Sequence, residues 1–231
     1  MLVCAQGILG ALRVGENNEW LAMMHGVFGQ VVFGSAVVLA ATASGLFRRP
    51  ETSTPGPTAT AARVSRAVTS VTLGCVLVQL LFGAMSRHIG APHATWSHAA
   101  FAFLVAGAVG LSGMMLRSAE SYSRSGRALR KIGVLLIALI GAQFVLGFVV
   151  LWQVTQAPER PIPTADELAT AVPFDLTEAI VTTLHQSLGA GILALTSLAV
   201  FWTHAIARHH APITQPSGPV ANENAAAAVP A

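Results

Sequence analysis

The hydrophobic residues of this chain form long uninterrupted stretches, and polar residues are confined to the links between them. Four stretches, 20–47, 88–116, 132–158 and 179–207, contain no Asp, Glu, Lys or Arg. Each is longer than the roughly 20 residues that cross a bilayer as a helix. A fifth stretch, 67–86, just reaches that length, and a sixth, 1–12, is shorter. The pattern predicts an all-α fold, a polytopic transmembrane helix bundle of about six helices, which we place at 2–14, 18–47, 65–87, 94–117, 130–153 and 175–206.

Composition and charge support this prediction and orient the bundle. Hydrophobic residues make up 53% of the chain and charged residues 10%, against roughly a quarter charged in a soluble domain. The second and fourth links are basic, whereas the first and fifth, around 15–19 and 159–175, are mainly acidic. Because basic links stay in the cytoplasm, we predict a multi-pass protein of the inner (plasma) membrane with both termini cytoplasmic. The basic residues therefore report topology, and no nucleic-acid partner is expected.

The links divide the predicted helices into two groups. A Pro/Thr/Ala-rich cytoplasmic linker at 48–64 separates a hairpin at 1–47 from four helices at 65–207, and we expect the Pro/Ala-rich tail at 208–231 to be disordered. The first helix is short, since 13 helical residues span only about 20 Å. We therefore expect the chain to be the C-terminal part of a longer protein.

A short motif recurs on the three helices that run outward. It reads Gln6-x-x-Leu9-Gly10, Gln79-x-x-Phe82-Gly83 and Gln143-x-x-Leu146-Gly147. The following inward-running helix then carries one His near its outer end, 19 residues after Gln6 and Gln79 and beyond a longer loop after Gln143; these are His25, His98 and His185. The unit is thus a helical hairpin repeated three times.

Two interpretations of the repeated histidines remain open. Each imidazole could hydrogen-bond a neighbouring helix through the repeated Gln and hold the bundle together. Alternatively the histidines are axial ligands of haem iron, with His98 and His185 as one pair and His25 in a second site whose partner lies outside this chain. Small residues follow each His, and a flat macrocycle between helices needs such space; ordinary close helix packing explains them almost as well. They are Gly26 and Gly29, Ala99 and Ala100, and Gly189 and Gly191.

Other polar residues are weaker candidates. Arg13, at the outer end of the first helix, could pair with a haem propionate, because a guanidinium matches a carboxylate, or act as an interfacial anchor. His88 and His93 fall in the predicted outer loop, where solvated side chains are the simpler interpretation. His204, His209 and His210 fit a solvated inner flank. Cys4 and Cys75 lie in apolar segments and predict no disulfide.

Taken together, the segments AQGILGALRV, LAMMHGVFGQ, QLLFGAMSRH, HAAFAF, QFVLGF and LHQSLGA resemble the haem A synthase family of cytochrome oxidase assembly proteins. The resemblance runs through all six predicted helices. It implies two four-helix halves, each binding a haem near the outer surface, and oxidation of haem O to haem A. By this resemblance 1–47 matches the end of the first half, with His25 its second His. The second half is 65–207, where His98 and His185 bind haem b.

The chain departs from the family pattern at its start. The family's first two helices, which carry the Glu and His-Arg motifs linked to substrate oxidation, have no counterpart here, so no catalytic residue is assigned. If another chain supplies them, we expect an oxidoreductase, with haem O synthase or terminal oxidase subunits as partners besides membrane lipid. If not, a non-catalytic b-type haem-binding protein or truncated remnant is the alternative. A structural bundle without cofactor is a third hypothesis and predicts a colourless protein.

Overall fold

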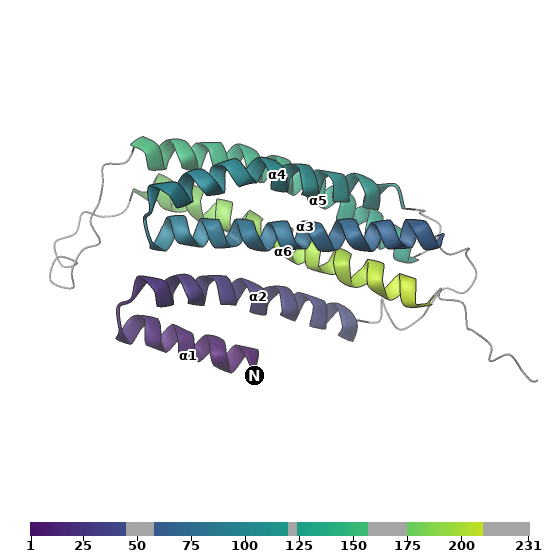
Figure 1. Ribbon diagram of the computed structural model, residues 1–231, viewed down its shortest axis with the longest axis horizontal. Coiled ribbons are helices and arrows are strands. Elements are labelled where there is room, and N and C mark those ends of the chain that lie inside the picture. The colour runs from purple at the N-terminus through teal and green to yellow at the C-terminus, as the bar shows by residue number, and fades with distance from the viewer. Residues whose placement is uncertain (45–57, 120–123, 157–174, 210–231) are drawn as a thin grey trace, which may run out of the picture.

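The computed structural model describes residues 1–44, 58–119, 124–156 and 175–209, and all regular structure in these ranges is helical. Six helices follow one another: α1 (Leu2–Gly15), α2 (Glu19–Ala43), α3 (Ala59–His88), α4 (Pro92–Arg117), α5 (Arg124–Gln156) and α6 (Leu176–His209). Five of them, α2 to α6, are long and apolar enough to cross a membrane. The predicted all-α transmembrane bundle is therefore confirmed (Figure 1).

Two tight turns make the first two hairpins. Between α1 and α2 the chain turns at Asn17, whose φ of 42° is one that asparagine tolerates better than most residues, and the Asn18 side chain caps α2 by accepting from the backbone of Trp20. Between α3 and α4 the turn uses Gly90, with φ 65°, and Pro92 begins the next helix. Similar turns place the two hairpins' Gln and His residues at matching heights.

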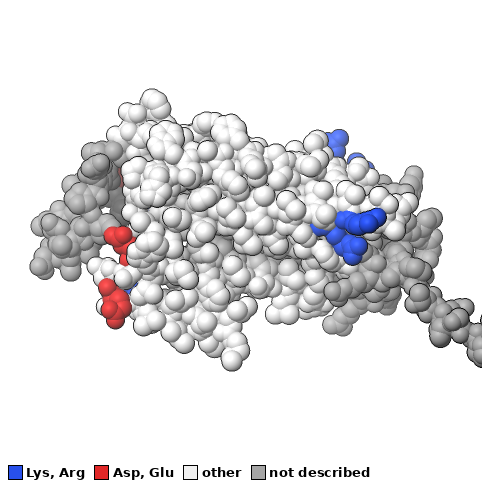
Figure 2. Space-filling model, viewed as in Figure 1, with Lys and Arg blue, Asp and Glu red and all other residues white. Residues whose placement is uncertain are grey.

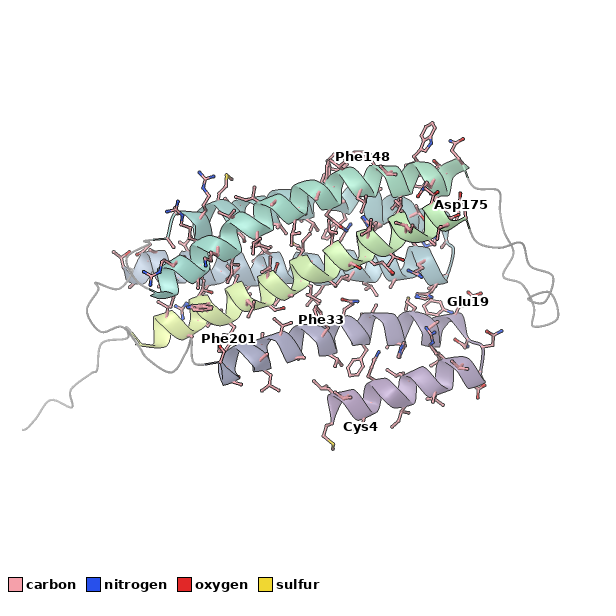
Figure 3. The ribbon with its side chains drawn as sticks, turned by 180° about the vertical axis from the view of Figure 1, so that it is seen from behind. Cys4, Glu19, Phe33, Phe148, Asp175 and Phe201 are labelled. Carbon is pink, nitrogen blue, oxygen red and sulfur yellow. The ribbon has the colours of Figure 1, made fainter. Side chains whose placement is uncertain are left out.

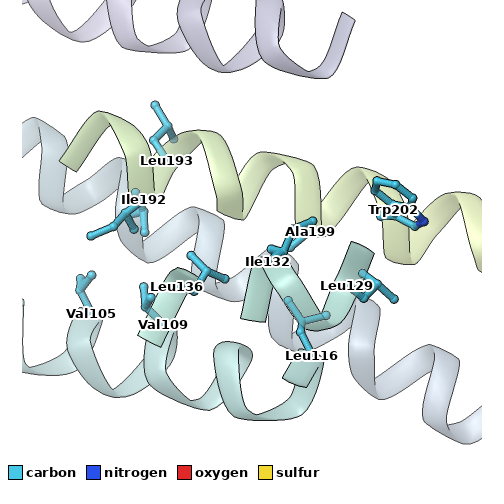
Figure 4. Packing of buried hydrophobic residues seen from close by; sticks show 11 residues of the cluster. Val105, Val109, Leu116, Leu129, Ile132, Leu136, Ile192, Leu193, Ala199 and Trp202 are labelled. Atoms are coloured by element: carbon cyan, nitrogen blue, oxygen red, sulfur yellow. The ribbon is translucent and has the colours of Figure 1, made fainter. Parts of the chain in front are cut away.

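The apolar core lies within the last four helices. Its buried cluster draws on Val76 of α3, Val109 of α4, Leu136 of α5 and Leu193 of α6, among others (Figure 4). Hydroxyl groups on the inner side of this core bond across helices, as between Thr72 Oγ1 and Ser112 Oγ at 2.8 Å. With no water in the bilayer to satisfy buried hydroxyls, such pairs connect helices that apolar contact alone would leave free to slide.

The first hairpin lies beside this four-helix bundle. In Figure 1, α2 runs along the bundle and α1 lies on its far side. Helix α2 packs on α6 and α3, and α1 packs on α2. Helices α2 and α6 pack closely at Gly34, where an added Cβ would lie 3.2 Å from Ser197 Oγ. The three hairpins, α1–α2, α3–α4 and α5–α6, therefore pack against one another in one bundle.

Charged side chains gather at the two ends of the molecule. Acidic residues lie at the end where α1 joins α2 and α6 begins, and most basic residues lie at the opposite end (Figure 2). Arg13 and Arg87, in the last turns of α1 and α3, lie at the acidic end. Glu19 and Asp175 mark the first end and Phe201 the region near the second (Figure 3). The basic end includes Arg63 and Arg66 in the first turns of α3, and Arg130 and Lys131 in α5. This separation is the one that the sequence predicts for the two membrane faces.

Five helix boundaries differ from the prediction by three residues or more. Helix α2 ends at Ala43 instead of residue 47, and α5 ends at Gln156 instead of residue 153. Helix α3 begins at Ala59 instead of residue 65, because Thr58 caps it by accepting from the backbone of Ala61, so the predicted linker 48–64 overlaps this helix. Helix α5 begins at Arg124 instead of residue 130. Helix α6 continues to His209, into the predicted tail. Hydropathy marks where a segment leaves lipid, whereas the helical hydrogen bonds continue into water. Residues 45–57 of the link region and 210–231 of the tail, with His210, lie outside the described residues.

Candidate functional site

The repeated Gln and His residues meet in all three hairpins. The amide Nε2 lies 3.4 Å from the imidazole Nε2 in Gln6–His25 and Gln79–His98, and 3.2 Å in Gln143–His185. In the first two hairpins the same amide nitrogen also donates to the main-chain oxygen of the His, at 3.0 and 2.9 Å. The contact between each His and the repeated Gln, on which the first interpretation depends, is therefore present. This contact leaves the ligand interpretation open.

The glycine that ends each motif explains how the imidazole fits. A Cβ added to Gly10 or Gly83 would lie 3.0 Å from the Cε1 of His25 or His98, and one added to Gly147 would lie 3.3 Å from Cε1 of His185. Such distances are shorter than ordinary side-chain contacts. Each glycine is thus the place where the imidazole rests against the opposite helix.

Small residues on the inward-running helix make room for the amide in return. Four residues after each His stands Gly29, Ala102 or Gly189. A Cβ on Gly29 would lie 2.8 Å from Gln6 Nε2, and one on Gly189 would lie 3.5 Å from Gln143 Nε2. Residues four apart lie on the same face of a helix. In each hairpin the outward-running helix therefore contributes a Gln and a glycine to this face, and the inward-running helix contributes a His and a small residue. Gly29 and Gly189 were noted from the sequence but Ala102 was not, and this pairing was not found there, although the constant spacing was its signal.

The hydrogen bonds determine the tautomer of His98. Its Nδ1 lies 3.1 Å from the main-chain oxygen of Gln79, so Nδ1 carries the proton and donates it. The Nε2 atom then holds a lone pair, which accepts from the Gln79 amide. A neutral imidazole with this pattern is the form that binds a metal through Nε2 while Nδ1–H donates to a carbonyl.

The second and third hairpins bring two of the predicted ligands together. The ring centroids of His98 and His185 lie 6.2 Å apart, with their planes at 72°. Aromatic contacts adjoin the pair along the chain: Phe82, in the Gln79 motif, packs edge-to-face on Phe101 at 5.7 Å, and Phe144, next to Gln143, packs on Phe103 at 5.1 Å. Phe103 is 60% exposed, so the second of these contacts lies at the surface of the bundle.

Buried polar atoms without partners recur at this level. Within the described residues they include Nδ1 of His25 and His185 and Oε1 of the three motif glutamines. Buried polar atoms without hydrogen bonds are costly and few in native proteins. Their repetition at three equivalent positions distinguishes this level of the bundle from ordinary helix packing.

The weaker candidates are placed as follows. Arg13 is half-buried in the last turn of α1. His88 is the last residue of α3 and half-buried, so its assignment to a solvated loop was wrong: its Nε2 lies 3.6 Å from the position of a Cβ on Gly26, beside His25. His93 is exposed in the first turn of α4. At the inner end, His204 Nδ1 donates to the Val200 carbonyl at 2.9 Å.

Within the described residues, the potential metal ligands brought together at this site are the two imidazoles of His98 and His185. Among the residues that the structure describes, no group of three or more His, Cys, Asp or Glu could hold a metal ion, and Cys4 and Cys75 are free thiols. In comparisons with known proteins, no family model, curated protein or solved structure matches the chain. The geometry of His98 and His185 therefore carries the functional argument.

Proposed function

We propose that this chain is a haem A synthase-like membrane protein in which His98 and His185 are the axial ligands of haem b. In this proposal it contributes to the oxidation of haem O to haem A for cytochrome oxidase assembly. The single observation that carries the haem site is the approach of two imidazoles from equivalent positions of two hairpins, 6.2 Å apart. The specific reaction rests on the family resemblance of the sequence.

The residues present fit a haem on three grounds. A metal–imidazole bond is about 2 Å long, so two rings on opposite sides of one ion have centroids about 6 Å apart, close to the separation seen here. Nε2 of His98 carries the ring's lone pair, the one that would bind iron, because Nδ1 donates to the main-chain oxygen of Gln79. A glycine on the opposing helix, Gly83 or Gly147, lets each ring lie directly against that helix. Two imidazoles are a ligand set that can hold a haem iron without a third protein ligand.

Each residue at the proposed haem site would have a defined role. The haem iron supplies the electron-transfer chemistry when bound. His98 and His185 would hold it, the Gln79 carbonyl would keep His98 in its ligating tautomer, and the neighbouring aromatic side chains would exclude water. Arg13 could pair with the carboxylates of a haem at the outer end.

The catalytic step is proposed for a second site. His25 has the same Gln contact and the same facing glycine as the other two histidines, so we infer that it too can act as an axial ligand. Haem O as substrate and haem A as product would occupy that site. No residue of this chain is assigned to the oxidation itself, and the partners proposed are haem O synthase or terminal oxidase subunits.

A non-catalytic b-type haem-binding protein is the second candidate. The observation that favours it is the position of the imidazole pair, His98 and His185, within the chain. Both residues lie in 65–207, the half that the family resemblance links to a resident haem and not to the substrate. Incubation of membranes containing the chain with haem O separates the candidates, since only a haem A synthase-like protein would contribute to haem A formation.

The absorption spectrum of the detergent-purified chain tests the haem site directly. We expect the sharp reduced bands of a six-coordinate haem, and pyridine extraction should identify it as haem b. A colourless protein after expression with ample haem would contradict the proposal and favour the structural bundle.

Placing a methyl group at Gly83 should weaken haem binding. The Cβ of Gly83→Ala would lie 3.0 Å from His98 Cε1 and 3.2 Å from its Nδ1, so the ring must move and its bond to the Gln79 carbonyl is strained. Loss of such support for a metal-binding His costs about 10- to 100-fold in affinity. The measurement is a haem titration by absorbance. Gly74→Ala, in the same helix with nothing near its Cβ, is the control and should bind haem as the parent does.

The proposed orientation in the inner (plasma) membrane can be tested by labelling. In a background of Cys4→Ser and Cys75→Ser, a thiol at His93→Cys should react with an impermeant maleimide added outside spheroplasts. A thiol at Arg63→Cys should react only after permeabilisation, because basic helix ends stay cytoplasmic. Both positions are exposed at opposite ends of the bundle. The reverse labelling pattern would refute the orientation.

A further inference from the structure

The atom by which each His would bind iron already has an occupant. In all three hairpins the closest side-chain contact of the imidazole Nε2 is the amide nitrogen of the motif glutamine, at 3.2 to 3.4 Å. An amide N–H donates into the imidazole lone pair, and the same lone pair forms a bond to a metal. One lone pair cannot serve both, so the hydrogen bond and the metal bond exclude each other.

We propose that Gln79 and Gln143 block the ligating nitrogens of His98 and His185 in the cofactor-free chain, and that each amide turns away when haem iron binds. The inference rests on the proposed function for its haem step. The glutamines are positioning residues that keep both imidazoles neutral and turned toward their ligating direction, while excluding protons and other metal ions from Nε2.

The unpartnered amide oxygens favour such an exchange. Oε1 of Gln79 and Gln143 is buried without a hydrogen-bond partner, which makes the observed amide position costly. A glutamine serving only as helix glue would gain by satisfying both ends of its amide. Rotation away from the imidazole gives Oε1 the chance to find a donor, so the cost of displacing the amide is partly offset.

The two glutamines differ in how firmly they are held. Gln79 Nε2 also donates to the His98 main-chain oxygen at 2.9 Å, whereas the imidazole of His185 is the contact that holds the Gln143 amide. The block should therefore be more persistent at His98 than at His185, and removing it should have its larger effect at His98.

Acylation by diethyl pyrocarbonate tests the block without haem. This apolar reagent modifies unprotonated imidazole nitrogen, and mass spectrometry of the haem-free full chain gives a rate for each His. Gln79→Leu keeps the approximate size of the side chain but removes the donor. We expect it to raise the rate at His98 about two- to tenfold, the equivalent of one hydrogen bond, and Gln143→Leu to raise the rate at His185.

Two references make the result specific. His93 is exposed and far from both glutamines in sequence, so its rate should stay constant. Gln153→Leu removes another amide with a buried unpartnered oxygen and no His contact among the described bonds, and it should leave His98 and His185 at parent rates. A structural role alone predicts lower thermal stability of Gln79→Leu with an unchanged or slower rate at His98, which would overturn the inference.

The haem step is tested by stopped-flow mixing of haem with the detergent-solubilised chain. Gln79→Leu and Gln143→Leu should bind haem faster than the parent and Gln153→Leu, with the same final amount. Equal or slower association in both variants would overturn the block as a step in haem loading. If the parent binds no haem, the proposed function fails, whereas the acylation rates still decide whether the amides block Nε2.

Discussion

Replacing both His98 and His185 by alanine is expected to remove haem b almost completely from the purified chain. The two rings lie 6.2 Å apart, and no cluster of three or more His, Cys, Asp or Glu among the described residues offers another metal site. Burial of the macrocycle alone gives weak and unspecific retention. The measurement is the reduced-minus-oxidised spectrum together with pyridine extraction, normalised to protein.

Two single variants and a control variant are needed to interpret the result for the double variant. His98→Ala and His185→Ala should each give a five-coordinate spectrum and weaker retention, because one axial ligand remains. His204→Ala removes an imidazole that bonds only its own helix, to the Val200 carbonyl, and should keep the parent spectrum. A double variant with the haem content and spectrum of the parent would show that His98 and His185 are structural.

Replacing Gly133 by valine is expected to destabilise the bundle more than any substitution at the haem site. A Cβ at Gly133 would lie 2.5 Å from the main-chain oxygen of Gly113 and 2.6 Å from the main-chain nitrogen of Arg117. Backbone atoms cannot rotate away as a side chain can, so α4 and α5 must separate. Overpacking of a tight core costs about 1–3 kcal/mol or more, and loss of this interface exposes the neighbouring core.

Thermal unfolding in detergent, followed by circular dichroism or fluorescence-detected gel filtration, measures this effect. Gly141→Ala, in the same helix with nothing within reach of its Cβ, is the matched control and should be neutral or slightly stabilising, since alanine favours a helix over glycine by about 1 kcal/mol. Equal stability of Gly133→Val and the control would mean that α4 and α5 do not approach as closely as described.

The site was partly predictable from sequence. The constant spacing from Gln6 to His25 and from Gln79 to His98 revealed the repeat, and a Gln–His hydrogen bond was one of two interpretations of it; the structure shows this contact. The spacing was informative because a short turn fixes the register of two antiparallel helices. The spacing did not show that the imidazole packs against the motif glycine, or that the amide nitrogen contacts the imidazole Nε2. These contacts depend on how far each helix is rotated about its axis.

Hydrophobic pattern by itself determined the helices and their number. In lipid every backbone polar group of a single spanning segment must be hydrogen-bonded within that segment, so a long apolar stretch forms a helix. The basic and acidic links mark the two ends of the bundle. Boundaries were less certain, as at Ala59 and His88, because the helical bonds extend beyond the lipid that hydropathy detects.

Only the tertiary structure decided which faces meet. It placed His98 opposite His185, His88 against Gly26, and Gly113 against Gly133. A transmembrane helix is apolar on nearly every side, so its sequence gives the depth of a residue without giving the neighbour that it faces. That choice depends on close packing of small residues between helices, which is a property of the assembled bundle and of no single segment.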